Sequence, residues 1–415
     1  MPGIITHSNS SMSRQALRQQ AEKHRLVRLF RGAYMDAQEY AALDISGRYR
    51  ARAQAFLATH AKLRAWGITA AALEGAPVLG GAPLHFGGAR SHAKSKQDGC
   101  AFHEASLETP SNPVAQTLFE CASTSPLPDA LLAANYLLRR SSAKAQGGLV
   151  ACRDIDESTT EALVWEPATS GSGEASSRSA FDIRMLDMEE PEFLANYSAA
   201  RVTGFVSPEA ELLWLAFAQL CFANGGKRGI RSALKAGLYF TDQVESPAES
   251  LLIARCAELG FEIPYLQVNI LDPSNGRHLG RVDGLWPSEA VQKSLYRSDS
   301  RFGRFLQCRR LGDNGSIVIE FDGNLKYRQD YAEVLERERQ RQNAIGNLGF
   351  RFVRIGWDDL MRPERLRSIL EAARVPRCRG KRGERLKKLR ELLLDARFCQ
   401  PSAPNRSDFA CQKRA

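Results

Sequence analysis

The order of secondary-structure patterns between residues 245 and 375 constrains the fold most strongly. A proline near the start of 245–261 and a glycine at its end are typical of a helix. Three segments of strand length follow, then a long charged helical segment, a fourth strand segment and a last helix that begins at Trp357. The predicted strands are 263–271, 280–287, 316–323 and 350–356, and the charged helix is 331–349. This order predicts an α/β core, in which a β-meander has a later strand beside it and helices cover both faces.

Two carboxylates stand at the end of the third strand segment, which reads IVIEFDG. Because strand side chains alternate, Glu320 and Asp322 point to one face of the sheet. Asp283 lies in the adjacent strand segment and Glu249 on the preceding helix, so the pattern predicts that these carboxylates converge. Clustered carboxylates repel one another unless a cation neutralises them, and Mg²⁺ prefers oxygen ligands. We predict a magnesium site made by Asp283, Glu320 and Asp322, with Glu249 assisting and Lys326 positioning water or phosphate.

Each of these residues also has a purely structural interpretation. Asp322 and Asp283 both stand directly before a glycine, which is a common turn pair. Glu249 near a helix start is favoured by the helix dipole whatever it binds. Lys326 is compatible with a solvated start to the next element. The functional interpretation depends on all of them falling at corresponding ends of neighbouring elements.

A helix followed by a basic hairpin is predicted near the N-terminus. Ser13 is a favourable N-cap for a helix over 13–24, and residues 25–35 alternate as in a short hairpin that turns at Gly32. This is the order of the second half of a winged helix-turn-helix, although only about a dozen residues precede the helix. The residues predicted to contact DNA are Arg14, Gln15 and Arg18 on the helix, and Arg28 and Arg31 on the hairpin.

The middle of the chain has a mixed pattern. We expect helix to continue over 47–75, short strands and loops over 76–110, and two amphipathic helices over 110–140. The predicted regions are a winged-helix-like DNA-binding region (1–60), a linking α/β region (61–140), a flexible insertion (141–185), a helical region (186–240), the α/β core (241–375) and a basic tail (376–415).

Charge is concentrated at the two ends of the chain. Residues 1–66 hold 11 Lys+Arg against 4 acids, and residues 377–415 hold 12 against 4, whereas the part between them holds 34 against 39. Basic ends around an acidic centre predict two attractions to a polyanion such as DNA. Solvated termini that aid solubility are the alternative interpretation.

Cysteine usage and hydropathy bear on the compartment. The nine cysteines are scattered and include no Cys-x-x-Cys pair, which argues against a disulfide framework. No apolar run reaches membrane-spanning length, and the first residues lack the pattern of a secretory signal. We therefore expect a soluble cytoplasmic protein with no membrane partner.

Several motifs carry a resemblance to a known family. In order, ESPAES, VDGLWP, IEFDGNLKY and RQNAIGNLGFRFVRIGWDDL resemble the restriction-endonuclease-like domain, related to very-short-patch-repair endonucleases, that ends many actinobacterial proteins of the AbiEi antitoxin type. HRLVRLFRGAYM, THAKLRAWGI and TPSNPVAQTLFECA are similar to the winged-helix and linking regions of the same proteins. The motifs are short, and their shared order carries the resemblance. It covers nearly the whole chain except 141–180, 288–315 and the basic tail.

The resemblance implies roles for individual residues. Asp283 corresponds to the first metal-binding acid, Glu320 to the second and Glu249 to a helical acid that assists. Active nucleases of this fold usually carry a lysine two residues after the second acid, where this chain has Asp322. Lys326 would then substitute from the following loop.

Two functions of different classes follow from these patterns. The first is a DNA-binding protein with a Mg²⁺-dependent DNA endonuclease domain, used in defence or repair. The second is a transcriptional regulator or antitoxin of an abortive-infection system, with a cognate toxin as partner and a catalytically silent nuclease fold. A structural protein with no DNA role fits poorly with the basic ends.

Overall fold

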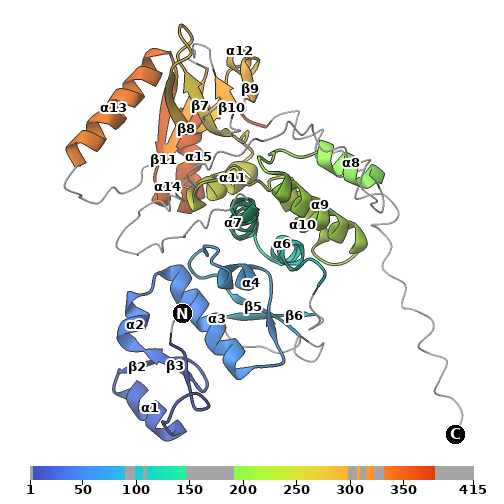
Figure 1. The fold of residues 1–415 in the computed structure, drawn as a ribbon, viewed down its shortest axis with the longest axis vertical. Helices are drawn as coiled ribbons and strands as arrows, with labels where there is room; N and C mark the ends of the chain where they lie inside the picture. Colours follow the sequence, from blue (N-terminus) through green and yellow to red (C-terminus); the bar gives the residue numbers. More distant parts are fainter. Residues whose placement is uncertain are drawn as a thin grey trace, which may run out of the picture.

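The computed structural model describes residues 3–88, 99–105, 110–145, 191–297, 306–308, 315–321 and 331–378. These residues form a mixed α/β structure with three small sheets (Figure 1). Within these ranges, no helix is long and apolar enough to cross a membrane. Asp322, Lys326, most of the predicted insertion and the tail beyond Cys378 lie outside the described residues.

The N-terminal unit contains the predicted helix and hairpin. Ser13 caps α1 (Arg14–Glu22) by accepting a hydrogen bond from the Ala16 backbone N–H at 3.1 Å. Strands β2 (Leu26–Phe30) and β3 (Ala33–Asp36) pair antiparallel, and Gly32 between them has φ +85°. A short strand, β1 (Ile5–Thr6), pairs with the other edge of β3. The predicted helix and the predicted hairpin are therefore both confirmed. Helices α2 (Ala37–Ala42) and α3 (Ile45–Thr59) follow them in the chain.

The continuous helix predicted over 47–75 is wrong beyond Thr59. The chain instead forms β4 (Arg64–Ala65) and then α4 (Ile68–Leu73). Gly67 separates them with φ +51°, a conformation that interrupts a right-handed helix. A Cβ at Gly67 would lie 3.3 Å from the Glu120 carbonyl, so the close approach of another helix selects glycine here.

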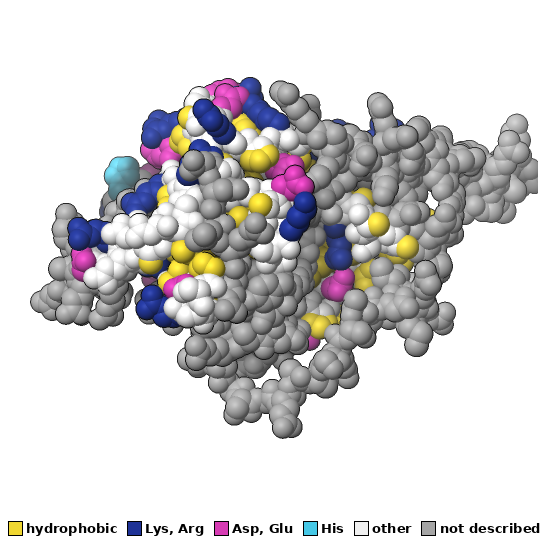
Figure 2. Space-filling model, turned by 90° about the horizontal axis from the view of Figure 1, so that it is seen from above, with side chains coloured by type: hydrophobic (Ala, Val, Ile, Leu, Met, Phe, Trp, Pro, Cys, Tyr) yellow, Lys and Arg dark blue, Asp and Glu magenta, His cyan; other side chains and the backbone are white. Residues whose placement is uncertain are grey.

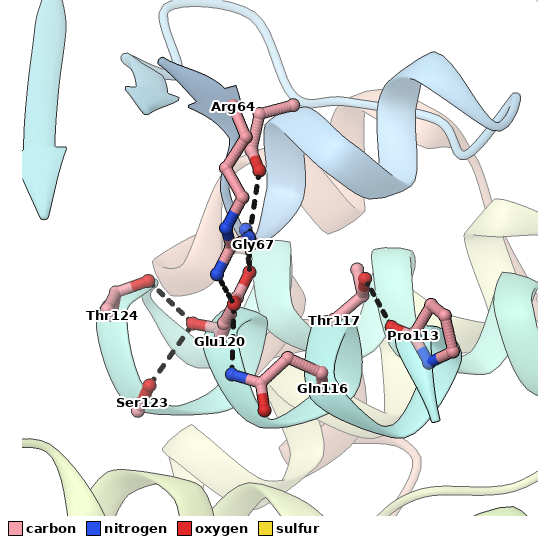
Figure 3. A network of polar contacts seen from close by, with 9 residues as sticks. Arg64, Gly67, Pro113, Gln116, Thr117, Glu120, Ser123 and Thr124 are labelled. Atoms are coloured by element: carbon pink, nitrogen blue, oxygen red, sulfur yellow. Dashed lines mark hydrogen bonds and ion pairs between the residues drawn. The ribbon is translucent and has the colours of Figure 1, made fainter. Parts of the chain in front are cut away.

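Glu120 holds this region in place (Figure 3). It lies on α6 (Pro113–Thr124), is fully buried and accepts two hydrogen bonds from Arg64, at 2.6 and 3.3 Å. The Gly67 backbone N–H and the Gln116 side chain also donate to it, at 3.1 and 3.0 Å. A buried carboxylate with this many donors is fully compensated, so it fixes β4 and α4 onto α6.

The middle sheet has the order β4-β5-β6, with β5 (Leu84–Gly88) parallel to β6 (Cys100–Glu104) and antiparallel to β4. The two helices predicted over 110–140 are confirmed as α6 and α7 (Leu127–Ala145). They pack with α8 (Pro191–Ala199), α9 (Pro208–Ala223) and α10 (Ile230–Gly237) around the largest apolar core, which includes Trp214 and Tyr197.

The C-terminal unit has a six-stranded sheet in the order β12-β11-β8-β7-β10-β9. Strands β7 (Tyr265–Leu271), β8 (His278–Trp286) and β11 (Ile317–Phe321) form the predicted antiparallel meander, and β12 (Arg351–Ile355) lies parallel beside β11. The stretch 288–315, which the resemblance left uncovered, contributes α12 (Glu289–Gln292), β9 (Leu295–Arg297) and β10 (Leu306–Cys308).

Helices cover both faces of this sheet, as predicted. On one face, α11 (Pro247–Leu259), α14 (Trp357–Met361) and α15 (Pro363–Ala372) pack on Ile317 and Ile319. On the other face, Ile345 of α13 (Tyr331–Asn347) packs with Val318 and Val282. We call these the α11 face and the α13 face.

Candidate functional site

Asp283 lies on β8 beside the end of β11. The regular pairing of these strands runs from Ile317 opposite Trp286 to Ile319 opposite Gly284. One residue further on, the Asp283 side chain accepts a hydrogen bond from the Phe321 backbone N–H at 3.0 Å. This bond places the Asp283 carboxylate where Glu320 and Phe321 no longer pair regularly with β8, although both still pair with β12.

Glu249 is the buried acid of the site. It lies in the first turn of α11, 3% exposed, and Ser246 is the N-cap of this helix. Its carboxyl group accepts hydrogen bonds from the Glu245 backbone N–H, the Ser246 hydroxyl and the Gln267 amide, at 2.9, 2.8 and 3.0 Å. Burial raises the pKa of Glu249 to about 8, and the negative charge of Asp283 adds to this rise. All three donors are neutral, so no positive charge offsets a negative charge on the Glu249 carboxylate.

The backbone at Gln267 is unusual. Gln267 has φ +51°, a region that residues other than glycine, asparagine and aspartate rarely occupy. It is 2% exposed and directs its amide to Glu249. Backbone strain of this kind persists only where surrounding contacts enforce it, and it is common at functional sites.

Two arginines border the acidic pair. Arg281, two residues before Asp283 on β8, forms a 2.5 Å ion pair with Glu245, and Arg139 of α7 approaches the same carboxylate at 3.6 Å. Burial raises the pKa of Glu245, Asp283 raises it further, and the two arginines lower it. The site therefore contains Glu245, Glu249 and Asp283 with two cations at its border.

Glu320 has different partners. Its carboxylate accepts hydrogen bonds from Arg341 and from Gln342, the latter at 3.0 Å, and both donors lie on α13. Arg341 also donates to the Arg281 carbonyl at 3.1 Å and packs against Gly280, where a Cβ would lie 2.8 Å from it. Glu320 is thus held on the α13 face, whereas Glu249 lies on the α11 face.

The structure therefore brings Asp283 and Glu249 within electrostatic reach and gives Glu320 a basic partner. Asp322 and Lys326 fall outside the described residues, so the shared magnesium site stays a prediction. In the part of the chain that the structure describes, no group of three or more His, Cys, Asp or Glu side chains is arranged to hold a metal ion.

Sequence reasoning missed Glu245, Gln267, Arg281 and Arg341. Only Arg281 carried a signal that could be recognised in the sequence, because it stands two residues before Asp283, which is one strand repeat. Glu245 precedes the N-cap Ser246, so no helical spacing relates it to Glu249. Gln267 and Arg341 reach the site through tertiary packing and carried no local signal.

The residues predicted to bind DNA are all on the surface. Arg14, Gln15 and Arg18 on α1 are exposed, as are Arg28 on β2 and Arg31 in the turn. Among the described residues, none of the four arginines has a hydrogen-bond or ion-pair partner. Free guanidinium groups beside a hairpin are suited to phosphate.

Comparison of the chain with protein-family models, with curated proteins and with solved structures gives no match.

Proposed function

We propose that this protein binds DNA and that its C-terminal α/β unit carries a metal-dependent site for phosphodiester hydrolysis. The observation that carries the proposal is the buried Glu249 carboxyl group, which three neutral donors hold and whose pKa the charge of Asp283 raises. The pKa of Glu249 rises to about 8 because its carboxyl group is buried among neutral donors beside a second carboxylate. Such a site gains free energy from an added positive charge, and its oxygen donors fit Mg²⁺.

The roles follow from the chemistry of the residues. Asp283, Glu320 and Asp322 would hold Mg²⁺, with Glu249 behind Asp283. When bound, the ion would lower the pKa of a water molecule at the site and would stabilise negative charge on the phosphate. Lys326 would position water or phosphate. Glu320 takes part only after it releases Arg341, because that guanidinium occupies its carboxylate.

The architecture supports the same proposal. A helix, an antiparallel meander, a further helix and a parallel strand occur in the order that the resemblance to restriction-endonuclease-like domains implies. Helix α1 is followed by the β2–β3 hairpin, and β1, which precedes α1 in the chain, pairs with the free edge of β3. This arrangement supports a winged-helix-like DNA-binding region. The scattered cysteines support a cytoplasmic location.

A second candidate is favoured by the bond between Glu320 and Arg341. Arg341 supplies the positive charge that a metal ion would otherwise supply to Glu320, as expected for a nuclease fold without activity. The protein would then be a transcriptional regulator or antitoxin that binds DNA through its N-terminal region, with a cognate toxin as partner.

One experiment tests both candidates. The full chain is incubated with supercoiled plasmid in Mg²⁺ or in EDTA, and nicking and mobility shift are measured together. We expect Mg²⁺-dependent nicking that falls to background in Asp283→Asn and in Glu320→Gln. The asparagine of the first variant keeps an oxygen that can accept from the Phe321 N–H, so the fold is retained. Asp272→Asn in the exposed β7–β8 turn is the matched control.

Each outcome of this experiment selects one conclusion. A plasmid shift that persists in EDTA, with no nicking in Mg²⁺, contradicts the nuclease and supports the regulator. The absence of both nicking and shift overturns DNA binding itself.

A further inference from the structure

A second basic surface lies on the helical region, far along the chain from the hairpin. Residues 212–241 contain four cations and no acid. Three of the cations, Lys227, Arg228 and Arg231, are exposed, and Lys235 is half-buried. We call these four residues the α10 surface.

Among the described residues, the cations of the α10 surface have no acidic partner. Lys227 donates to the neutral side chain of Asn224 at 2.8 Å. Arg228, Arg231 and Lys235 have no hydrogen-bond or ion-pair partner in the described part of the chain.

Two exposed cations of the C-terminal unit differ from these because they have acidic partners. Lys293 pairs with Glu289 at 2.8 Å, and Arg362 lies 3.8 Å from Asp358. Seen from the end of the molecule that carries the C-terminal unit, Lys and Arg side chains are interspersed with Asp and Glu (Figure 2).

The backbone beneath the α10 surface is fixed. Gly226 and Gly229 turn the chain with φ +79° and +89°, and Gly229 lies so close to α6 that a Cβ would be 2.3 Å from the Ser123 carbonyl. The opposite side of α10 is buried in the largest core through Ile230 and Leu234. The cations are therefore held on a rigid support.

Folding accounts for only one of the four cations: Lys235 lies in the last turn of α10, where the helix dipole favours a positive charge. Arg231 and Lys235 are one helical turn apart, and like charges at this spacing repel. Within the described ranges, none of the four cations covers a buried acid or caps a carbonyl. The three exposed cations, Lys227, Arg228 and Arg231, have no such benefit, and their clustering therefore indicates a binding partner.

We propose that the α10 surface contacts the phosphate backbone of DNA as a second site, beyond the N-terminal region. The inference rests on the proposed DNA binding. The 8 residues of α10 extend about 12 Å, a length along which one DNA strand presents several phosphates. Spread cations of this kind fit a polyanion better than a single small anion.

The test uses the full chain and a 30-base-pair duplex labelled with a fluorophore. Anisotropy gives the dissociation constant between 50 and 200 mM KCl for the wild type and for the triple variant Lys227→Ala/Arg228→Ala/Arg231→Ala. We expect affinity to fall about tenfold or more, and the slope of log K against log salt to lose about 2 to 3 units. Circular dichroism confirms that the variant is folded.

The matched control is Lys293→Ala/Arg362→Ala/Arg367→Ala, which removes the same charge from cations that already have acidic partners. We expect this control to retain most of the affinity and slope. Equal losses in the two triple variants overturn the proposal, because they report net charge alone.

Failure of this inference is distinguishable from failure of the proposed function. If the wild type does not bind the duplex, the proposed function fails. The second outcome is that the wild type binds the duplex, that Arg28→Ala/Arg31→Ala weakens this binding and that the α10 variant does not. In that case only the second site is wrong. If the α10 triple variant loses affinity for an RNA duplex of the same sequence and not for the DNA duplex, the assignment of this surface to DNA is also overturned.

Discussion

His85 shows how burial fixes a charge state at the residue scale. It lies on β5, 5% exposed, with its Nδ1 2.9 Å from Nε2 of His103 on β6. Burial, with a smaller contribution from the charge of His103, lowers the pKa of His85 to about 4. His103 itself faces Glu120 of α6, which raises its pKa against the larger effect of burial. The folded protein therefore keeps His85 neutral at a pH where the unfolded chain protonates it.

This difference predicts a pH dependence of stability. The unfolded chain takes up a proton at His85 near pH 6.5 and the folded chain only near pH 4, so the free energy of unfolding falls as pH drops through this window. We expect His85 to account for a loss of about 2 kcal/mol between pH 7 and pH 5. Thermal unfolding of the wild type and of His85→Phe at pH 5, 6, 7 and 8 measures it.

The exposed His24 provides the control, as His24→Asn, because asparagine tolerates its φ of +55°. We expect His85→Phe to show a flatter dependence on pH than either the wild type or His24→Asn. Equal slopes in all three proteins would show that burial of His85 is not coupled to folding.

Residue-level prediction named three of the acids discussed above, but not Glu245 and not the partners of these acids. Asp283, Glu320 and Glu249 follow from strand ends and a helix start, which are local patterns. The donors to these acids are distant in sequence: Gln267 is 18 residues from Glu249, and Arg341 is 21 residues from Glu320. Which basic group reaches which acid depends on how α11 and α13 pack on the sheet, and no local pattern encodes that.

At the scale of elements, Gly229 determines how closely α10 approaches α6. Its φ is +89°, and a Cβ there would lie 2.3 Å from the Ser123 carbonyl. Gly81 has a similar φ of +82° but open space around it. Substitution of Gly81 therefore measures the free-energy cost of a left-handed backbone alone. Substitution of Gly229 measures that cost together with the cost of a steric clash.

We expect Gly81→Ala to lower the free energy of unfolding by about 1 kcal/mol, through backbone strain alone. Gly229→Ala should cost at least about 2 kcal/mol more, because α10 must move away from α6. Urea unfolding of both variants measures the difference. A similar loss in both would show that the contact between Gly229 and Ser123 does not limit the packing of these helices.

Elements with local start and stop signals were predictable, and those made by pairing were not. Ser13 marked α1, and Pro247 with Gly260 marked α11, at the positions that the structure has. Strand β4 is two residues long and exists because Arg64 and Ala65 pair with Gly87 and Phe86. Strand β10 is likewise defined by its parallel pairing with β7, across a connection that local patterns describe as a loop.

At the scale of the whole molecule, charge separates the ends from the centre. Lys+Arg exceed acids by seven in residues 1–66 and by eight in 377–415, whereas the centre has an excess of acids. If DNA is the partner, both ends are attracted to the same duplex, whereas within the acidic centre only a local group of cations such as the α10 surface can contact it. The two ends then contribute separate contacts, and their effects on affinity should add.

A double-variant cycle in the full chain tests this addition. Arg28→Ala/Arg31→Ala removes two cations from the N-terminal region, and Lys387→Ala/Lys388→Ala removes two from the tail. We expect each pair to reduce the slope of log K against log salt by about 2 units, and all four substitutions together by about 4. Anisotropy with one duplex at several salt concentrations measures every member of the cycle. An unchanged slope for the tail variant would mean that the tail does not contact DNA. A combined effect no larger than either single effect would mean that the ends compete for one site.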